Sequence, residues 1–117
     1  MIYIWIDDLR PVPERYSAKK WIVCSTVNDT MKIIRQKYKS GNTDFFLDID
    51  NDAGFEYAKH GGDYINILKQ LESMYYGGHL KYINVQIHIH SMNPVAVQNM
   101  RAIIQANSKF MSEGRLI

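Results

Sequence analysis

The sequence predicts an α/β fold, with a mainly parallel sheet of four to five strands and helices on both faces. Short runs of β-branched and aromatic residues with almost no polar break recur along the chain, as in strands buried on both faces. Segments with helical apolar spacing separate most of these runs, and this alternation is typical of a parallel sheet. A length of 117 residues is usual for one domain, so residues 1–117 are expected to form a single unit.

Four stretches carry the strand pattern, and the last residues add a stub of a fifth: residues 2–6, 21–24, 44–48, 83–90 and 115–117. Pro11 and Pro13 interrupt the connection between the first two strands. Proline removes a backbone donor and disfavours helix interiors, so the helix expected in this connection is lost or shortened.

Three helices are expected between the remaining strands. Val27, Met31, Ile34 and Tyr38 share one helix face, which Thr26 or Asn28 would cap and Gly41 would end. Asp63 is the expected cap of a second helix that stops before residues 77–78. In the third, Asn93 is the expected N-cap and Pro94 the first helical residue.

Acidic residues follow the first and third strands. In a flavodoxin-like strand order these two strands are neighbours, and ligands bind at their carboxyl ends. Four candidate metal ligands lie there: Asp7, Asp8, Asp48 and Asp50. Crowded carboxylates repel one another unless a cation binds, and oxygen ligands suit Mg²⁺ first and Mn²⁺ next. The alternative is that these residues form turns and cap helices.

The segment after the fourth strand is the second candidate site. His90 is a candidate general acid or base, and the Ser91 hydroxyl is a candidate donor to a phosphoryl oxygen. Free amides at the start of the helix after Asn93 would bind an anion. The alternative is an ordinary turn followed by a well-capped helix start.

Two further residues have competing interpretations. Arg10, in the loop above the crevice, would bind a phosphate through both guanidinium branches, or would pair with Asp8 or Asp52 at the surface. His88 shares a strand face with His90, and a hydrogen-bonded core histidine is favoured over a metal ligand there. A zinc pair of these two histidines fits poorly beside oxygen ligands.

Composition excludes several classes of protein. A formal net charge of +2 is too small for strong non-specific binding to nucleic acid. One cysteine, Cys24, excludes an internal disulfide framework. No apolar run has the length of a membrane span, and the first residues lack the basic start of a signal peptide, so we expect a cytoplasmic protein without membrane contact.

Three segments together resemble the cyclic-phosphate processing receiver domain family, whose pattern combines a DD-x-R-x-x-P start, an LDxD centre and an HSxNP segment followed by NM. The matching segments here are residues 6–13, residues 47–50, and residues 89–94 with the NM pair at 99–100. The resemblance implies a truncated, receiver-like form of the flavodoxin-like fold. The chain departs from the pattern where Ile49 replaces a frequent histidine, and where residues 51–54 replace an expected glycine.

The resemblance implies processing of a cyclic phosphate, either a 2′,3′-cyclic RNA end or a cyclic nucleotide, by a Mg²⁺-dependent phosphoesterase. Asp7, Asp8 and Asp48 would hold the metal, with Asp50 adding its carbonyl. Arg10, His90, Ser91 and Asn93 would contact the phosphate. His90, Arg10 and Asp48 would act in catalysis, and a covalent route through Asp48 is an alternative mechanism.

Two other functions remain open at this point. The first is a phosphoacceptor domain in a signalling relay. Such receivers carry a lysine at the end of a fifth strand, whereas Lys109 falls at the end of the last expected helix, which counts against this function. The second is a domain that binds a cyclic nucleotide or an RNA end without turnover.

Overall fold

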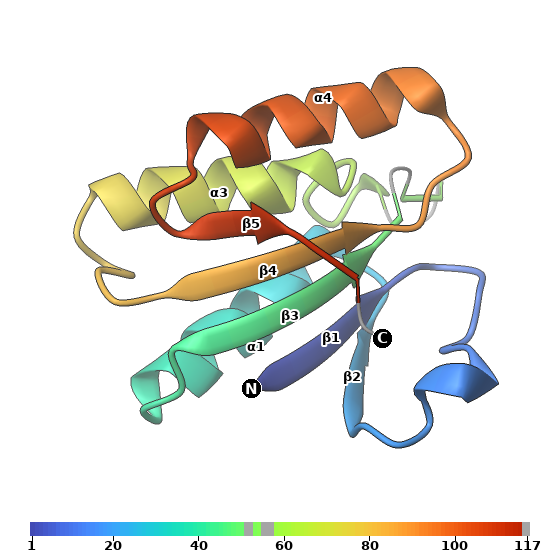
Figure 1. Ribbon diagram of the computed structural model, residues 1–117, viewed down its shortest axis with the longest axis horizontal. Coiled ribbons are helices and arrows are strands. Elements are labelled where there is room, and N and C mark those ends of the chain that lie inside the picture. Colours follow the sequence, from blue (N-terminus) through green and yellow to red (C-terminus); the bar gives the residue numbers. More distant parts are fainter. Residues whose placement is uncertain (51–52, 55–57, 116–117) are drawn as a thin grey trace.

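The computed structural model describes residues 1–50, 53–54 and 58–115. Within these residues, five parallel strands form one sheet in the order β2-β1-β3-β4-β5 (Figure 1). The strands are β1 (Ile2–Ile6), β2 (Trp21–Cys24), β3 (Asp44–Ile49), β4 (Asn84–Ile89) and β5 (Met111–Glu113). This order, with β1 between β2 and β3, confirms the expected receiver-like α/β fold.

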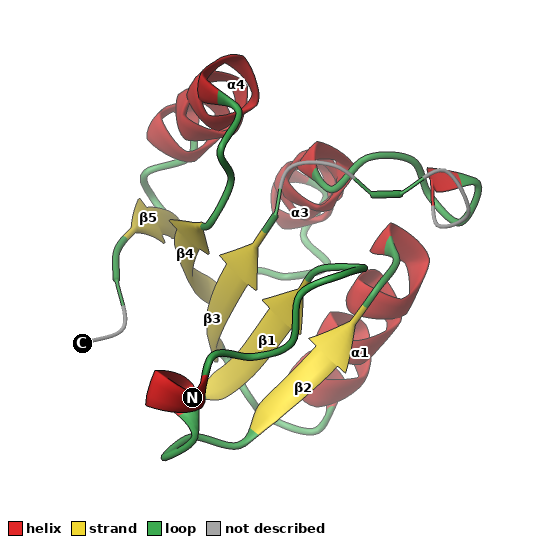
Figure 2. Cartoon of the chain, turned by 90° about the vertical axis from the view of Figure 1, so that its right-hand side faces the viewer, coloured by secondary structure: helices red, strands yellow, loops and turns green. Residues whose placement is uncertain are grey.

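The described helices cover the two faces of the sheet unequally. They are α1 (Val27–Lys39), α3 (Ile65–Tyr76), α4 (Pro94–Ala106) and the three-residue 3-10 helix η1 (Glu14–Tyr16). Figure 2 shows α1, α3 and α4 on one face, with η1 and its loop on the other. Helices were expected on both faces, but among the described residues the face opposite α1, α3 and α4 carries only the short turn η1. Pro11 and Pro13 account for this, and the expected loss or shortening of the first connecting helix is confirmed.

Each face of the sheet has its own apolar layer because side chains alternate along a strand. Ile4 and Ile6 of β1 are buried in the core beneath the α-helices. Tyr3 and Trp5 belong to an aromatic layer on the opposite face. The rings of Trp21 and Phe46 lie 5.9 Å apart in this layer, and Tyr16 of η1 stacks on Trp21 at 5.3 Å. This aromatic layer and η1 take the place of a packed helix.

Helix capping agrees with the sequence at two of the three helix starts. The hydroxyl of Thr26 accepts a hydrogen bond from the amide of Asp29, and the side chain of Asn93 caps α4. At α3 the expected cap Asp63 is one residue too early, because Tyr64 holds that position without a side-chain cap. The side chain of Tyr64 is fully buried, and its hydroxyl donates to the carbonyl of Ser25 at 2.7 Å.

Three strands differ from their expected bounds. The fourth strand, expected at 83–90, is one residue shorter at each end, at Asn84–Ile89. The fifth strand was expected at 115–117 but occupies Met111–Glu113, and residues 116–117 lie outside the described part of the chain. The third strand continues past Asp48 to Ile49 because Ile6 and Ile49 are still in register. Asp48 therefore lies within the strand, and Asp50 is the acid that follows it.

Among the helices described, none is long and apolar enough to cross a membrane.

Candidate functional site

Three of the four predicted metal ligands come together at the carboxyl ends of β1 and β3. Carboxylate oxygens of Asp7, Asp8 and Asp50 lie within 4.8 Å of one another. The amide of Asp50 donates to the carbonyl of Ile6 at 3.0 Å, which places the residues that follow the two strands side by side. These three residues are called the acidic cluster below. Oxygen donors of this kind suit a hard cation such as Mg²⁺.

Asp7 is the most constrained member of the acidic cluster. Its Oδ1 accepts the amides of Leu9 and Arg10 at 2.8 and 3.0 Å, and its Oδ2 faces His90 Nε2 at 2.9 Å. Burial would raise the pKa of this carboxyl, but the two amides and His90 outweigh burial and lower the pKa below its ordinary value. Asp7 is therefore held as an anion.

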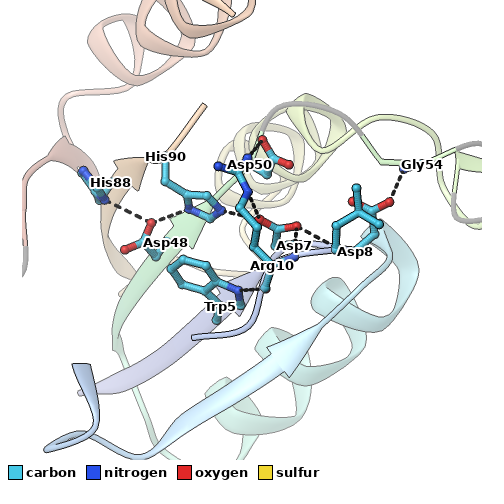
Figure 3. Close-up of polar contacts among 10 residues, drawn as sticks. Trp5, Asp7, Asp8, Arg10, Asp48, Asp50, Gly54, His88 and His90 are labelled. Atoms are coloured by element: carbon cyan, nitrogen blue, oxygen red, sulfur yellow. Dashed lines mark hydrogen bonds and ion pairs between the residues drawn. The ribbon is translucent and has the colours of Figure 1, made fainter. Parts of the chain in front are cut away.

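Arg10 lies across the acidic cluster. Its Nε is 3.2 Å from Asp7 Oδ2 and its Nη2 is 3.3 Å from Asp50 Oδ1 (Figure 3). The backbone of Arg10 is fixed independently, because its carbonyl accepts the indole N–H of Trp5 at 2.7 Å. The side chain is half-exposed, so the guanidinium can leave the cluster while the loop stays in place.

Asp48 is separate from the acidic cluster, contrary to the expectation that it ends the third strand. It pairs in register with Trp5, and its carboxylate is fully buried on the aromatic face of the sheet. Asp48 Oδ1 lies 2.6 Å from His90 Nδ1 and 3.0 Å from His88 Nδ1, while Oδ2 has no hydrogen-bond partner among the described residues. Asp48 thus contacts the two histidines of β4 and its carboxyl end.

His90 connects Asp48 with the acidic cluster. Its Nδ1 faces Asp48 and its Nε2 faces Asp7, and the ring stacks on Trp5 with centroids 4.1 Å apart and planes inclined by 4° (Figure 3). Ionised carboxylates only accept hydrogen bonds, so both contacts are hydrogen bonds when both ring nitrogens carry protons. The side chains of Asp48 and Asp7 thus fix the orientation of the His90 ring from both of its nitrogens.

A pocket of about 460 Å³ opens beside these groups. Among the described residues, its lining consists of Asp8, Leu9, Arg10, Asp50, Gly54, Met92 and Asn93. Asp8 is held at the wall because its Oδ2 accepts the amide of Gly54 at 2.9 Å. His90 and Ser91 are not part of this lining, and Figure 3 shows His90 beside Arg10 and Asp7.

The start of α4 differs from the free anion site that the sequence predicted. Asn93 Oδ1 accepts the amides of Val95 and Ala96 at 3.1 and 3.2 Å, and the amide of Val97 donates to the Asn93 carbonyl. Pro94 has no amide hydrogen. The first turn of α4 is thus already capped, and the side chain of Asn93 remains as the group at the pocket wall. The amide of Asn93 donates to Ser91 Oγ at 3.1 Å, so Ser91 supports this turn.

Sequence reasoning missed the role of Trp5 in this site, whereas it interpreted His88 correctly. The Trp5 ring stacks on His90, and its indole N–H donates to the carbonyl of Arg10. His88, interpreted as a hydrogen-bonded core histidine, has that role through Asp48. The available signal was the two-residue period: Trp5 and Asp7 share one strand face, as do His88 and His90.

A parallel sheet with an acidic carboxyl edge and an adjacent strand-to-helix loop defines a receiver-type domain. The chain belongs to the cyclic-phosphate processing receiver domain family, whose model matches residues 2–106. The comparison with curated proteins found no match, and the comparison with solved structures found none either.

Proposed function

We propose that this domain is a metal-dependent phosphoesterase that opens or removes a cyclic phosphate, such as a 2′,3′-cyclic RNA end or a cyclic nucleotide. Family membership supports a cyclic phosphate as the ligand class. The observation that carries the proposal is the position of His90, bracketed by Asp48 and Asp7 beside Arg10 and the acidic cluster. A fixed proton carrier, a guanidinium and several carboxylates next to an open pocket are the groups that phosphoester chemistry requires.

The acidic cluster would hold Mg²⁺, or Mn²⁺ in its place. Arg10 contacts both Asp7 and Asp50, so these two carboxylates would bind the ion together with Asp8 once the Arg10 side chain moves away. When bound, the ion supplies charge neutralisation and polarisation of a phosphoryl oxygen. Asp48, predicted as a ligand, is better suited to orient His90, because its Oδ1 contacts both histidines.

The residues of the chain would then divide the remaining tasks. Arg10 turns from the carboxylates to the phosphate, and its planar fork binds two phosphate oxygens. The side-chain amide of Asn93, at the pocket wall, donates to a third, with Ser91 as a second donor when the turn opens. A water oxygen bonds to phosphorus as one ribose oxygen leaves. The leaving oxygen takes the proton from His90 Nε2, and the pocket carboxylates take the proton of the water.

Two alternatives remain as predictions. A phosphoacceptor domain would be phosphorylated on a carboxylate, and the pocket presents Asp50 rather than the fully buried Asp48 to an incoming donor. A non-catalytic binder would use the same pocket without turnover.

One experiment separates these functions. The protein is incubated with Mg²⁺ and, in parallel, a 2′,3′-cyclic nucleotide, a 3′,5′-cyclic nucleotide and acetyl phosphate, and ³¹P NMR and intact mass are recorded. We expect turnover of a cyclic phosphate, reduced about 10²–10⁴-fold in His90→Gln. His79→Gln, a histidine between α3 and β4, is the control. Stable phosphorylation of the protein would favour the phosphoacceptor, and binding without turnover would favour the binder.

A further inference from the structure

We propose that Leu9 and Met92 form an apolar clamp for the base of a nucleotide substrate, a specificity that rests on the proposed function. Both side chains line the same pocket as Arg10 and Asn93, although they come from the loops after β1 and β4. They are among the most exposed large apolar side chains described, at 85% for Leu9 and 90% for Met92. Two such side chains on opposite loops of one polar pocket indicate a ligand with an apolar part.

The clamp residues are adjacent in sequence to the groups proposed for the phosphate. Leu9 precedes Arg10 and Met92 precedes Asn93. A ligand with its phosphate at Arg10 and Asn93 would therefore lie in the pocket that Leu9 and Met92 also line.

The backbone on both sides of the clamp is held in place. The amide of Leu9 donates to Asp7 Oδ1 at 2.8 Å, and the carbonyl of Arg10 accepts the indole of Trp5. On the other loop, the amide of Asn93 donates to Ser91 Oγ and its side chain caps α4. The exposed side chains thus stand on fixed positions, which lowers the entropic cost of closing them on a ligand.

The pocket favours one phosphate with one flat group over a phosphate alone. Its volume of about 460 Å³ falls in the range of about 300–1,000 Å³ usual for small-ligand sites. Its polar wall of Asp8, Arg10, Asp50 and Asn93 suits a phosphate and sugar hydroxyls, whereas Leu9 and Met92 offer only apolar contact. A methionine side chain is flexible and polarizable, so Met92 can cover the face of a purine or a pyrimidine.

The test compares two ligands that share the cyclic phosphate and differ in the base. Binding of adenosine 2′,3′-cyclic phosphate and of glycerol 1,2-cyclic phosphate is measured by calorimetry with Mg²⁺ present. We expect the wild type to prefer the nucleotide. The double variant Leu9→Ser with Met92→Ser should lose about tenfold in affinity for the nucleotide, and less than about twofold for the glycerol ligand. Val23→Ser with Tyr82→Ser is the matched control, because these side chains are also exposed apolar ones, at 59% and 67%, and do not line the pocket.

Each other outcome overturns the clamp in a recognisable way. An equal loss for both ligands would show that Leu9 and Met92 only shape the phosphate site, and no loss would show that they do not touch the ligand. Equal wild-type affinities would refute the clamp while the proposed function stands. If a phosphoserine peptide competes better than the nucleotide, Leu9 and Met92 would contact a protein partner and not a base. Failure of the wild type to bind either cyclic phosphate would overturn the proposed function, and the clamp with it.

Discussion

Removing the Arg10 side chain should strengthen divalent cation binding at the acidic cluster. The Arg10 guanidinium contacts Asp7 and Asp50 at 3.2 and 3.3 Å, so it occupies oxygens that the ion would use. These distances exceed the roughly 2.7–2.9 Å of strong charge-assisted bonds, and the side chain is half-exposed. Each pair is therefore worth about 0.2–0.5 kcal/mol, in the lower part of the range for exposed ion pairs.

Breaking both ion pairs would cost a binding cation about 0.4–1 kcal/mol of binding free energy. This free energy corresponds to a gain in affinity of about two- to fivefold in Arg10→Ala. Mn²⁺ binding is measured directly by electron paramagnetic resonance of the free ion, and Mg²⁺ by competition. Arg15→Ala is the matched control, because it removes the same charge from the same loop, where Arg15 lies over the ring of Tyr16 at 4.9 Å.

The result that would refute this reasoning is weaker Mn²⁺ binding in Arg10→Ala than in the wild type. Arg10 would then support the cation site rather than compete for it. An equal gain in Mn²⁺ affinity in Arg10→Ala and Arg15→Ala would show a general effect of net charge, and not displacement of the Arg10 guanidinium by the ion.

Three further predictions concern the same edge of the sheet. Asp8→Asn should remove most of the rise in melting temperature caused by Mn²⁺, whereas Asp44→Asn, an exposed acid at the other end of β3, should leave it unchanged. Because the pKa of Asp7 is lowered in the folded protein, its ionised carboxylate stabilises the fold at pH values above its ordinary pKa of 3.8. This contribution is lost as the pH falls through the pKa that Asp7 has in the folded state. Urea unfolding between pH 5 and about pH 2 should therefore show a shallower loss of stability in Asp7→Asn than in Asp44→Asn. Asn93→Ala should reduce the free energy of unfolding by about 1 kcal/mol through the lost cap of α4, and Asn93→Asp, which keeps an acceptor, should not.

Strand identity and order could be predicted from the sequence because both depend on local patterns. The apolar runs at Ile2–Ile6 and Trp21–Cys24 match β1 and β2 residue for residue. The prolines of the first connection predicted its short η1 turn. The pattern did not show that the aromatic layer would cover this face, because the partners of Trp5 and Phe46 come from other strands and from η1.

The position of Asp48 depends on strand register, which the sequence does not contain. Asp48 and Asp50 have the same spacing on either side of Ile49, so either acid could follow the strand. Only the pairing of Ile6 with Ile49 shows that the strand passes Asp48 and brings Asp50 beside Asp7. A shift of two residues along the strand thus separates a carboxylate of the pocket from a fully buried partner of His90.

The capped start of α4 shows a similar limit. The sequence identified Asn93 as the N-cap and also predicted free amides for an anion, and these two roles compete. Asn93 Oδ1 is bonded to two amides, so any anion at this helix start must replace those contacts. The phosphate contacts of the proposed function therefore depend on side chains, above all Arg10, more than on the helix end.

The buried chain Asp48–His90–Asp7 is costly for the fold, and this cost bears on its role. Asp48 is fully buried beside Trp5, and its Oδ2 lacks a hydrogen-bond partner among the described residues. Burial of this oxygen therefore lowers the free energy of unfolding. Apolar residues of similar volume often replace buried ionic groups without loss of stability. Stability alone thus gives no reason for a carboxylate at position 48. The proposed function would give one, since a general acid at His90 would need its ring held at both nitrogens, next to Arg10 and the pocket, before the substrate arrives.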